Sequence, residues 1–443
     1  MPDCILFLSQ NGFFLKNQFG FRANHSTDLA ASLLINKICN ALNEKKKVMS
    51  IFLDMLKAFD CVDHNILLQK MQVYGIRGNA FSWFSSYLSG RCQRVIFNGT
   101  LSETTCTVEC GVPQGSILGP LLYLIYINDI NQCFQYCHVT LYADDTTLVA
   151  TANNYKDLYR IANDDLSALS EWLCLNKLTM NISKTKYITY SISQRTVLKS
   201  DDLKLFLNGS VIERVDTFKF LGIYIDEHLT WKRHMNKVLS KIQRNLGIIR
   251  RISCFLTRKA LIQLFHSLVM SHIRYGIIVW HFGQISLRKK IQACANKFLR
   301  MIYFMKRDES VKNLMSENKI LSVNQIFRLE ISKLMQRVAI GCIPSPFTEM
   351  FRNQVKDLSI TTRSSSDYYQ PYMSAKKCQQ SICYTGPLIW GSVPSDIKMS
   401  MTEADFACSY DSRDQLILSH HSSLIKSFTK RMKKFSLHNV DFI

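Results

Sequence analysis

Three aspartates have the setting expected of a phosphoryl-transfer site. Asp54 follows an apolar run at 48–53, and Asp144 and Asp145 lie between two short apolar stretches. An Asp-Asp pair alone is equally typical of a turn. If both segments are neighbouring strands, the carboxylates lie close together, where like charges raise each other's pKa unless a cation neutralises them. Oxygen ligands on a rigid sheet favour Mg²⁺, and two such ions would clamp the attacking and leaving oxygens.

The chain is strongly basic. Its 443 residues include 55 Lys and Arg and 34 Asp and Glu, giving a formal net charge of +21. Residues 228–307 hold 17 Lys or Arg, no Asp or Glu, and interleaved aromatic residues. A helical face without acidic partners repels itself, so this segment predicts contact with nucleic acid rather than an ordinary solvated surface.

Composition excludes several classes of protein. Hydrophobic residues make up 47% of the chain, which is enough to bury a core and excludes disorder as the main state. The longest apolar runs, such as 121–127, are too short to cross a membrane. The N-terminus lacks the basic region of a secretory signal. The 15 cysteines are scattered without a Cys-x-x-Cys pair, which indicates reduced thiols in an intracellular protein of the nucleus or cytoplasm.

Hydrophobic periodicity predicts an α+β fold. Helices are expected at 29–42, 63–74, 116–131 and 155–175, and strands at 48–54, 138–149 (two strands around the Asp pair), 187–192, 203–207 and 218–225. A hairpin is expected with 94–98 and 104–110 as its two strands, on either side of the turn at Asn98-Gly99. The change in character at 228 predicts a division into 1–227, a basic helical region at 228–310, and a C-terminal region of unknown role at 311–443.

Ordered motifs resemble the reverse transcriptase of a non-LTR (LINE-type, jockey-like) retrotransposon. The matching blocks are 17–22 with 25–27, 52–60 extended by 62–64, 111–120, 142–145, 176–186 and 220–222. The similarity covers residues 12–310 and continues weakly to 398. It implies a right-hand polymerase fold with partial fingers, a palm of split βαβ type, a helical thumb and a small C-terminal region.

The resemblance implies a role for each matching residue. It implies that Asp54, Asp144 and Asp145 are the catalytic residues and the ligands of two Mg²⁺ ions, with Mn²⁺ also compatible. Phe59 corresponds to the aromatic residue that excludes a ribose 2′-hydroxyl, although a core aromatic is the alternative. Gln114 corresponds to the residue that positions the nucleotide.

The remaining matches concern the template, the triphosphate and the primer. Gly115 would let the backbone approach the template. Arg22 would meet the triphosphate or template, unless it is an ordinary surface arginine. Either Lys184 or Lys186 would protonate the leaving pyrophosphate, and the sequence does not distinguish them. The matching primer grip comprises Phe220, Leu221 and Gly222.

The implied function is RNA-directed DNA polymerisation, with an RNA template, a DNA primer and dNTPs as partners. The alternatives are an inactive remnant that still binds nucleic acid, an RNA-templated RNA polymerase, and a structural or membrane-surface protein. The aromatic side chain at Phe59 argues against an RNA-templated RNA polymerase, and the carboxylates argue against a structural or membrane-surface protein. The oligomeric state is not indicated.

The chain departs from the family pattern in four places. The endonuclease domain and the first fingers block are absent, which predicts an N-terminally truncated copy with an endonuclease encoded upstream. Leu56 stands where the family has a small polar residue, and residues 407–424 resemble an insertion.

Overall fold

The computed structural model describes residues 8, 12–192, 203–351, 368–394 and 398, so the expected insertion at 407–424 lies outside the described residues. These residues form two compact units. The first runs to Arg233 and includes Pro344–Pro346 and Ser374–Gln379, and the second begins at His234 and contains the remainder. Both helices and strands are present, so the predicted α+β class is confirmed.

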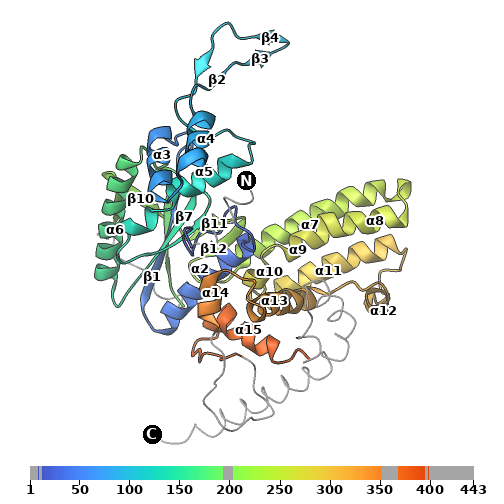
Figure 1. The fold of residues 1–443 in the computed structure, drawn as a ribbon. Helices are drawn as coiled ribbons and strands as arrows, with labels where there is room; N and C mark the ends of the chain where they lie inside the picture. Colours follow the sequence, from blue (N-terminus) through green and yellow to red (C-terminus); the bar gives the residue numbers. More distant parts are fainter. Residues whose placement is uncertain (1–7, 9–11, 193–202, 352–367, 395–397, 399–443) are drawn as a thin grey trace, which may run out of the picture. The chain divides into compact units, whose positions relative to one another are not determined.

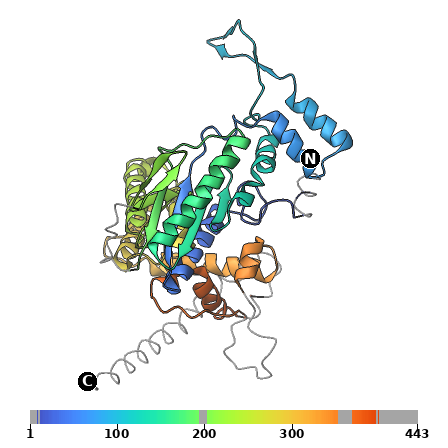
Figure 2. The same cartoon turned by 90° about the vertical axis from the view of Figure 1, so that its left-hand side faces the viewer.

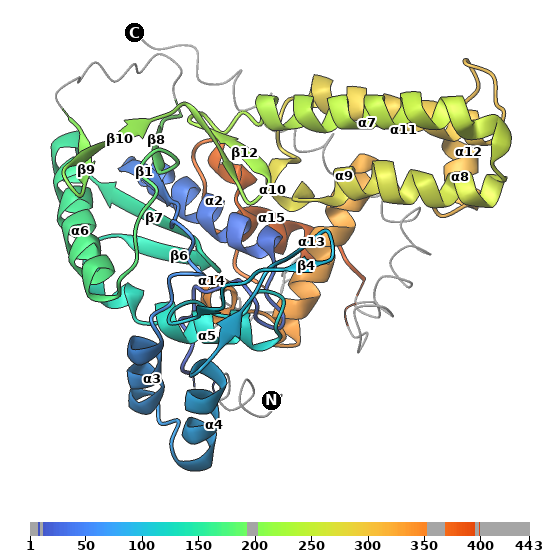
Figure 3. The ribbon, with the colours of Figure 1, turned by 90° about the horizontal axis from the view of Figure 1, so that it is seen from above.

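A six-stranded sheet organises the first unit, in the order β6-β7-β1-β8-β10-β9 (Figure 3). β1 (Lys47–Leu53) lies between β7 (Asp145–Ala152) and β8 (Lys186–Tyr190) and is antiparallel to both. The outer strands are β6 (His138–Tyr142), β9 (Leu205–Leu207) and β10 (Ser210–Arg214). β1 is buried over nearly its whole length, as its continuous apolar run predicts.

Two helical crossovers build this sheet. The first joins β1 to β6 through α3 (His64–Val73), α4 (Gly78–Leu88) and α5 (Leu118–Ile127), followed by the short η1 (Ile130–Cys133). The second joins β7 to β8 through α6 (Tyr155–Leu175). The two strands joined by each crossover are not neighbours in the sheet. β7 lies between β1 and β6, and β1 lies between β7 and β8. This is a split βαβ arrangement.

The two faces of the sheet are covered differently. Met49, Ile51 and Leu53 of β1 belong to the core that includes α5 and α6. Figures 1 and 2 show α6 lying along this face. α2 (Thr27–Asn43) contacts β1, β6 and β7, and Figure 1 shows it on the side away from α6. Alternate residues of a strand share a face, so Phe52 and Asp54 project on the side away from α6.

A thin arm projects from the first unit between α4 and α5 (Figures 1 and 2). Its base pairs β2 (Cys92–Gln93) with β5 (Cys106–Thr107), and its tip pairs β3 (Ile96–Phe97) with β4 (Thr100–Leu101) around Asn98-Gly99. The predicted turn is confirmed, but Thr104–Cys110 is not the partner of Arg94–Asn98. The strand pairing of the arm is interrupted, because the base and the tip form two separate two-stranded pairs.

A second hairpin replaces a predicted single strand. Residues 218–225 were expected to continue as one strand, whereas the structure has β11 (Thr217–Phe220) antiparallel to β12 (Ile223–Asp226). Leu221 and Gly222 form the turn, with φ values of 44° and 83°. Glycine at the second position makes this left-handed backbone accessible.

The second unit is helical. Its first helices are α7 (Lys232–Ile252, which begins in the first unit), α8 (Arg258–Phe265), α9 (Ser271–Arg274), α10 (Ile277–Trp280) and α11 (Ile285–Ile302), with the short η2 (Ser253–Phe255) and η3 (His266–Met270). Later elements are α12 (Lys312–Glu317), α13 (Val323–Ala339), α15 (Ile382–Trp390) and, partly in the first unit, α14 (Ser345–Met350) and η4 (Cys378–Gln380). Among the described residues, no helix is both long and apolar enough to span a membrane.

Candidate active site

The end of β1 and the β6–β7 turn bring the three predicted aspartates together. Leu53 of β1 pairs with Thr146 of β7, so Asp54 emerges opposite Asp145 at the next position. Ala143 and Asp144 form the turn between Tyr142 and Asp145, which pair with each other. Ala143 takes a φ of 56°, which allows the two strands to join through only two residues. The sheet register therefore explains why residues about 90 positions apart meet.

The three carboxylates interact electrostatically, in agreement with the strand register. The pKa of Asp145 is raised to about 6, because the surrounding protein disfavours its charged form and because Asp144 and Asp54 add negative charge. Asp145 nevertheless remains accessible to solvent on its open side. Across the site, Lys184 Nζ lies 3.5 Å from Asp54 Oδ2. The three carboxylates therefore concentrate negative charge, and the exposed ammonium group of Lys184 lies beside one of them.

The donor chemistry of this site fits a hard divalent cation. All three side chains offer carboxylate oxygens, the ligands that Mg²⁺ prefers, and their mutual repulsion is what such a cation relieves. Within the described part of the chain, no three His, Cys, Asp or Glu side chains lie close enough together to hold a metal ion as they stand, and this includes the three aspartates. The fit therefore rests on ligand type and charge.

A loop after α6 positions Lys184 beside the end of β1. Leu56 N donates to Thr179 O at 2.8 Å, and Asn181 N donates to Asp54 O at 2.8 Å. The amide groups of residues 184 and 185 both donate to Asn181 O, which closes the loop. Lys186, in contrast, is paired with Glu213 at 2.5 Å and contributes to the β8–β10 edge. Of the two lysines that the sequence did not distinguish, Lys184 therefore contacts Asp54, whereas Lys186 is engaged by Glu213.

The segment before α2 braces the turn that carries Asp144. Gln18 is 2% exposed, and its Oε1 accepts hydrogen bonds from Ala143 N at 3.1 Å and Gly20 N at 2.8 Å. Phe19 N donates to Leu141 O at 2.7 Å. A Cβ atom on Gly20 would lie only 2.3 Å from Ala143 N. The segment thus packs against the Asp144 turn so closely that only glycine fits.

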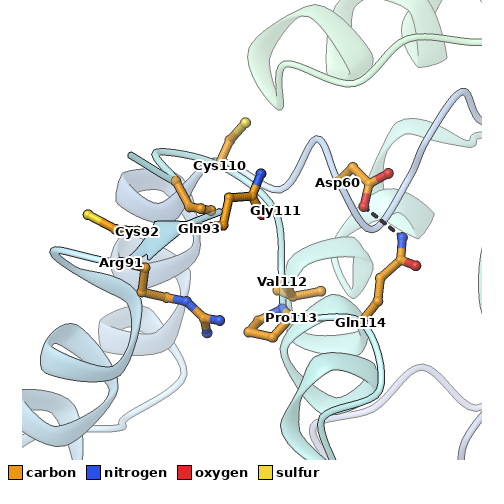
Figure 4. A pocket seen from close by; sticks show the side chains of 10 residues that line it. Asp60, Arg91, Cys92, Gln93, Cys110, Gly111, Val112, Pro113 and Gln114 are labelled. Carbon is orange, nitrogen blue, oxygen red and sulfur yellow. Dashed lines mark hydrogen bonds between the residues drawn. The ribbon is translucent and has the colours of Figure 1, made fainter. Parts of the chain in front are cut away.

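The segments 59–64 and 111–114, which are about 50 residues apart in the sequence, are joined by hydrogen bonds. Val112 N donates to Phe59 O at 2.9 Å, and His64 Nε2 lies 2.8 Å from Gly111 O. Gln114 Nε2 donates to Asp60 Oδ1 at 2.8 Å (Figure 4). The amide of Gln114 is therefore held beside Phe59, although both Gln114 and the adjacent Gly115 remain exposed.

Phe59 is half-buried beneath the site. Its ring stacks on Tyr123, with ring centroids 4.4 Å apart, and meets the edge of Phe21. Burial and the charges of Asp144 and Asp145 raise the pKa of Tyr123, which indicates that Tyr123 lies close to the carboxylates. Phe59 is thus linked to the acidic site through one aromatic neighbour, and its ring retains some exposure.

The β11–β12 hairpin packs beside Asp54. Phe52, which shares a face of β1 with Asp54, stacks on Phe218 with ring centroids 4.2 Å apart and also contacts Phe220. A cleft of about 550 Å³ lies between this hairpin and the acidic site. Its lining includes Asp54 and Asp145 with the cations Lys184, Lys186, Lys219 and Arg233. Phe220 and Leu221 line it too, so the predicted primer grip and two of the aspartates share one cleft.

Arg22 is not among the residues that line this cleft. Its guanidinium donates to Leu15 O at 2.7 Å and stands over the Phe14 ring at 5.4 Å. Burial lowers its pKa. These contacts give Arg22 a local role in holding the segment that precedes Gln18.

Comparison with known proteins identifies the family of the chain. Residues 5–225, about half of the chain, match the family model for reverse transcriptase (RNA-dependent DNA polymerase), which places the chain in the reverse transcriptase family. Its relatives are RNA-directed DNA polymerases of non-LTR retrotransposons. The chain is 28% identical over 304 residues to a probable RNA-directed DNA polymerase from transposon X-element of Drosophila melanogaster, covering 67% of this chain and 32% of the relative.

A second relative has similar coverage. The chain is 28% identical over 297 residues to the RNA-directed DNA polymerase from mobile element jockey of Drosophila funebris, covering 65% of this chain and 32% of that protein. The chain thus spans about a third of the length of these curated relatives. Among solved structures, apo telomerase from Candida tropicalis aligns with a TM-score of 0.41 at 13% identity, over 71% of this chain and 49% of that chain.

Sequence reasoning assigned no role to three of the residues that shape this site. Gln18, Gly20 and Asp60 lie inside recognised motifs, but their partners are Ala143 and Gln114. The only available signal was the motif itself, because nothing local to Gln18 indicates a contact 125 residues away.

Proposed function

We propose that this chain is the RNA-directed DNA polymerase of a non-LTR retrotransposon, extending a DNA primer on an RNA template with dNTPs. The observation that carries the proposal is the meeting of Asp54, Asp144 and Asp145 at one sheet edge, with coupled charges. The reverse transcriptase match over 5–225 supports it independently.

In this proposal the three aspartates hold two Mg²⁺ ions, with Mn²⁺ as a substitute. When bound, these ions supply Lewis acidity and neutralise charge on the reacting phosphate. The exposed ammonium group of Lys184 can turn from Asp54 toward the triphosphate and deliver a proton to the leaving pyrophosphate. Its 3.5 Å separation from Asp54 supports this role over one for Lys186, which is paired with Glu213.

The chain's own side chains would also select and orient the nucleotide. The ring of Phe59, fixed by stacking on Tyr123, would occupy the space of a ribose 2′-hydroxyl. Gln114, held by Asp60, would orient the sugar and triphosphate, while the exposed backbone at Gly115 would follow the template. The hairpin residues Phe220, Leu221 and Gly222 would support the primer end, because their cleft contains Asp54 and Asp145.

The finer subdomain assignment is part of the same proposal. Residues 1–227 would form the partial fingers and palm, 228–310 the thumb, and 311–443 a C-terminal region without an assigned role. Arg250, Arg251, Arg258 and Lys259 are exposed on the helices of the second unit, as a thumb that grips duplex phosphates requires. Binding through such contacts should weaken steeply with added salt, because each phosphate contact releases counterions.

Primer extension tests the proposal. The purified chain should extend oligo-dT on poly-A with Mg²⁺ and dNTPs, and chelation of the cation should stop the reaction. Phe59→Val should raise ribonucleotide use relative to deoxyribonucleotide use by about tenfold, or 1.4 kcal/mol of discrimination. Phe97→Val, which removes an exposed ring from the arm, is the matched control. Hybrid binding without extension would instead identify an inactive remnant.

A further inference from the structure

An aromatic ladder lies on the surface of α4, outside the acidic site. Trp83 and Tyr87, one helical turn apart, stack almost parallel, with centroids 5.4 Å apart and an interplanar angle of 11°. The guanidinium of Arg91, just beyond the helix, stands over the Tyr87 ring at 5.5 Å. Three planar groups therefore stack in series along one side of the helix.

The outer ring of the ladder is exposed where an ordinary core aromatic would be buried. Trp83 is 52% exposed, while its neighbour Phe84 faces the core at 5% and Tyr87 is partly buried against the core. The hydrophobic core thus accounts for Phe84 and helps to hold Tyr87, but it does not account for Trp83. The surrounding segment is also basic, because residues 64–102 include Lys70, Arg77, Arg91 and Arg94 but no Asp or Glu. Planar faces in a positive environment suit unpaired bases on a phosphate backbone.

The ladder leads into a pocket beside the nucleotide-positioning block. Arg91 lines a pocket of about 550 Å³ together with Gln93, Pro113 and Gln114. Figure 4 shows the Arg91 guanidinium extending into this pocket toward Pro113, with the Asp60–Gln114 hydrogen bond on the far side. A nucleic-acid strand that runs along these three side chains would therefore reach Gln114 through this pocket, which is separate from the cleft near the primer grip.

We propose that Trp83, Tyr87 and Arg91 bind the single-stranded RNA template ahead of the site of synthesis and guide it to the pocket beside Gln114. This inference rests on the proposed polymerase function. It adds a base-stacking site on α4, which would hold unpaired template bases regardless of their identity, because every base has a π face.

The chemistry favours a single strand over a duplex. Paired bases show only their edges in the grooves, whereas stacking on Trp83 needs a free base face. Arg91 adds both charge and a planar surface, and a lysine would supply only the charge. A template 5′ overhang is the part of the substrate that offers unpaired bases at this position.

The test compares two RNA–DNA hybrids that differ only in a 5′ RNA overhang of about ten nucleotides, a length within the range of single-strand sites. The overhang should tighten binding by wild type about tenfold or more. Trp83→Leu with Tyr87→Leu should abolish that gain while leaving blunt-hybrid affinity unchanged. Arg91→Lys should lose part of it. Phe97→Leu, another exposed ring, should behave as wild type.

Each outcome has a separate meaning. If the overhang adds no affinity, or adds the same affinity in the double variant, the ladder does not bind template and the inference is overturned. Equal loss in Phe97→Leu would also overturn it. If wild type binds neither hybrid and extends no primer, the proposed function itself fails. Melting temperatures should show that every variant is folded at the assay temperature, and that of Phe97→Leu should match wild type, since this ring lies at the surface.

Discussion

Two hairpins of the first unit, the β6–β7 turn and the arm at 91–110, differ in how they are held. The β6–β7 turn is clamped by Gln18 and by the close approach of Gly20, so its backbone has little freedom. The arm at 91–110 projects from the body, and Phe97 at its tip is 75% exposed. Under the proposed function, the turn that carries Asp144 must fix a carboxylate to within a fraction of an ångström. The tip of the arm carries no group with a proposed catalytic role, so the difference in bracing matches the proposal.

Removing the carboxylate of the braced turn should have the largest effect. Asp144→Asn should lower the rate of primer extension roughly a hundredfold or more, because it removes a charge from the reacting site. Folding and hybrid binding should persist, since like-charge repulsion falls. Asp164→Asn, on the exposed surface of α6, is the control. A variant that retains even a tenth of wild-type extension would refute the assignment of Asp144.

Loosening the brace should have the next largest effect. In Gly20→Ala the new methyl group would clash with the Ala143 backbone, which cannot move without moving Asp144. We expect a loss of about 1–3 kcal/mol of unfolding free energy, together with reduced extension. Gly247→Ala in α7 meets open space and serves as the control. Chemical denaturation and single-nucleotide kinetics would measure the two effects. Unchanged stability would show that the Ala143 backbone can shift to accommodate the methyl group at no cost.

The crowded charge of the turn should make stability depend on pH. The pKa of Asp145 is raised to about 6 in the folded chain from an ordinary value near 3.8, so the folded state binds the proton more tightly. In the presence of a chelator, its stabilising contribution is therefore complete below pH 3.8 and is lost as pH rises through 6. Asp145→Asn should remove this component of the melting-temperature profile.

The magnesium response provides a second measurement. At pH 7.5, Mg²⁺ should raise the melting temperature of wild type more than at pH 5, because ionised carboxylates bind the cation. Asp145→Asn should show a smaller response at both values. Identical profiles for wild type and variant would contradict the coupling among the three aspartates.

The arm should tolerate change best. Replacing Ile96 and Phe97 with serine removes apolar surface that is already in water, so unfolding free energy should shift by no more than about 0.5 kcal/mol. Extension on a short template should remain at the wild-type rate. Thermal melting and the primer assay measure both quantities. A loss of more than about 1 kcal/mol would show that the tip packs against something and that the two hairpins are not so different.

Sequence predicted the elements whose signals are local. The apolar run of β1 and the helical periodicity of α6, expected at 155–175 and observed as Tyr155–Leu175, needed no distant information. The Asp144 turn was predicted because Asp-Asp between two apolar stretches is a short-range pattern. These elements carry the three aspartates, which is why the candidate site could be anticipated.

The remaining features depend on contacts or on weak signals. α4 was not predicted, because its serines are modest helix formers and its exposed aromatics obscure the apolar stripe. The β11–β12 turn was missed because Leu221 lies in an apolar run that reads as a continuous strand. The brace between Gln18 and Ala143 joins residues 125 positions apart, and no local pattern encodes it.

The central place of β1 in the sheet has a consequence for synthesis on the ribosome. β1 pairs with β7 and β8, whose residues follow about 100 and 140 positions later. Asp54 therefore leaves the ribosome long before the strands that flank it, and β1 must wait as an unpaired apolar segment. Such long-range pairing slows folding and exposes the nascent chain to aggregation. We expect chains interrupted before β8 to be targets for chaperones rather than partial polymerases.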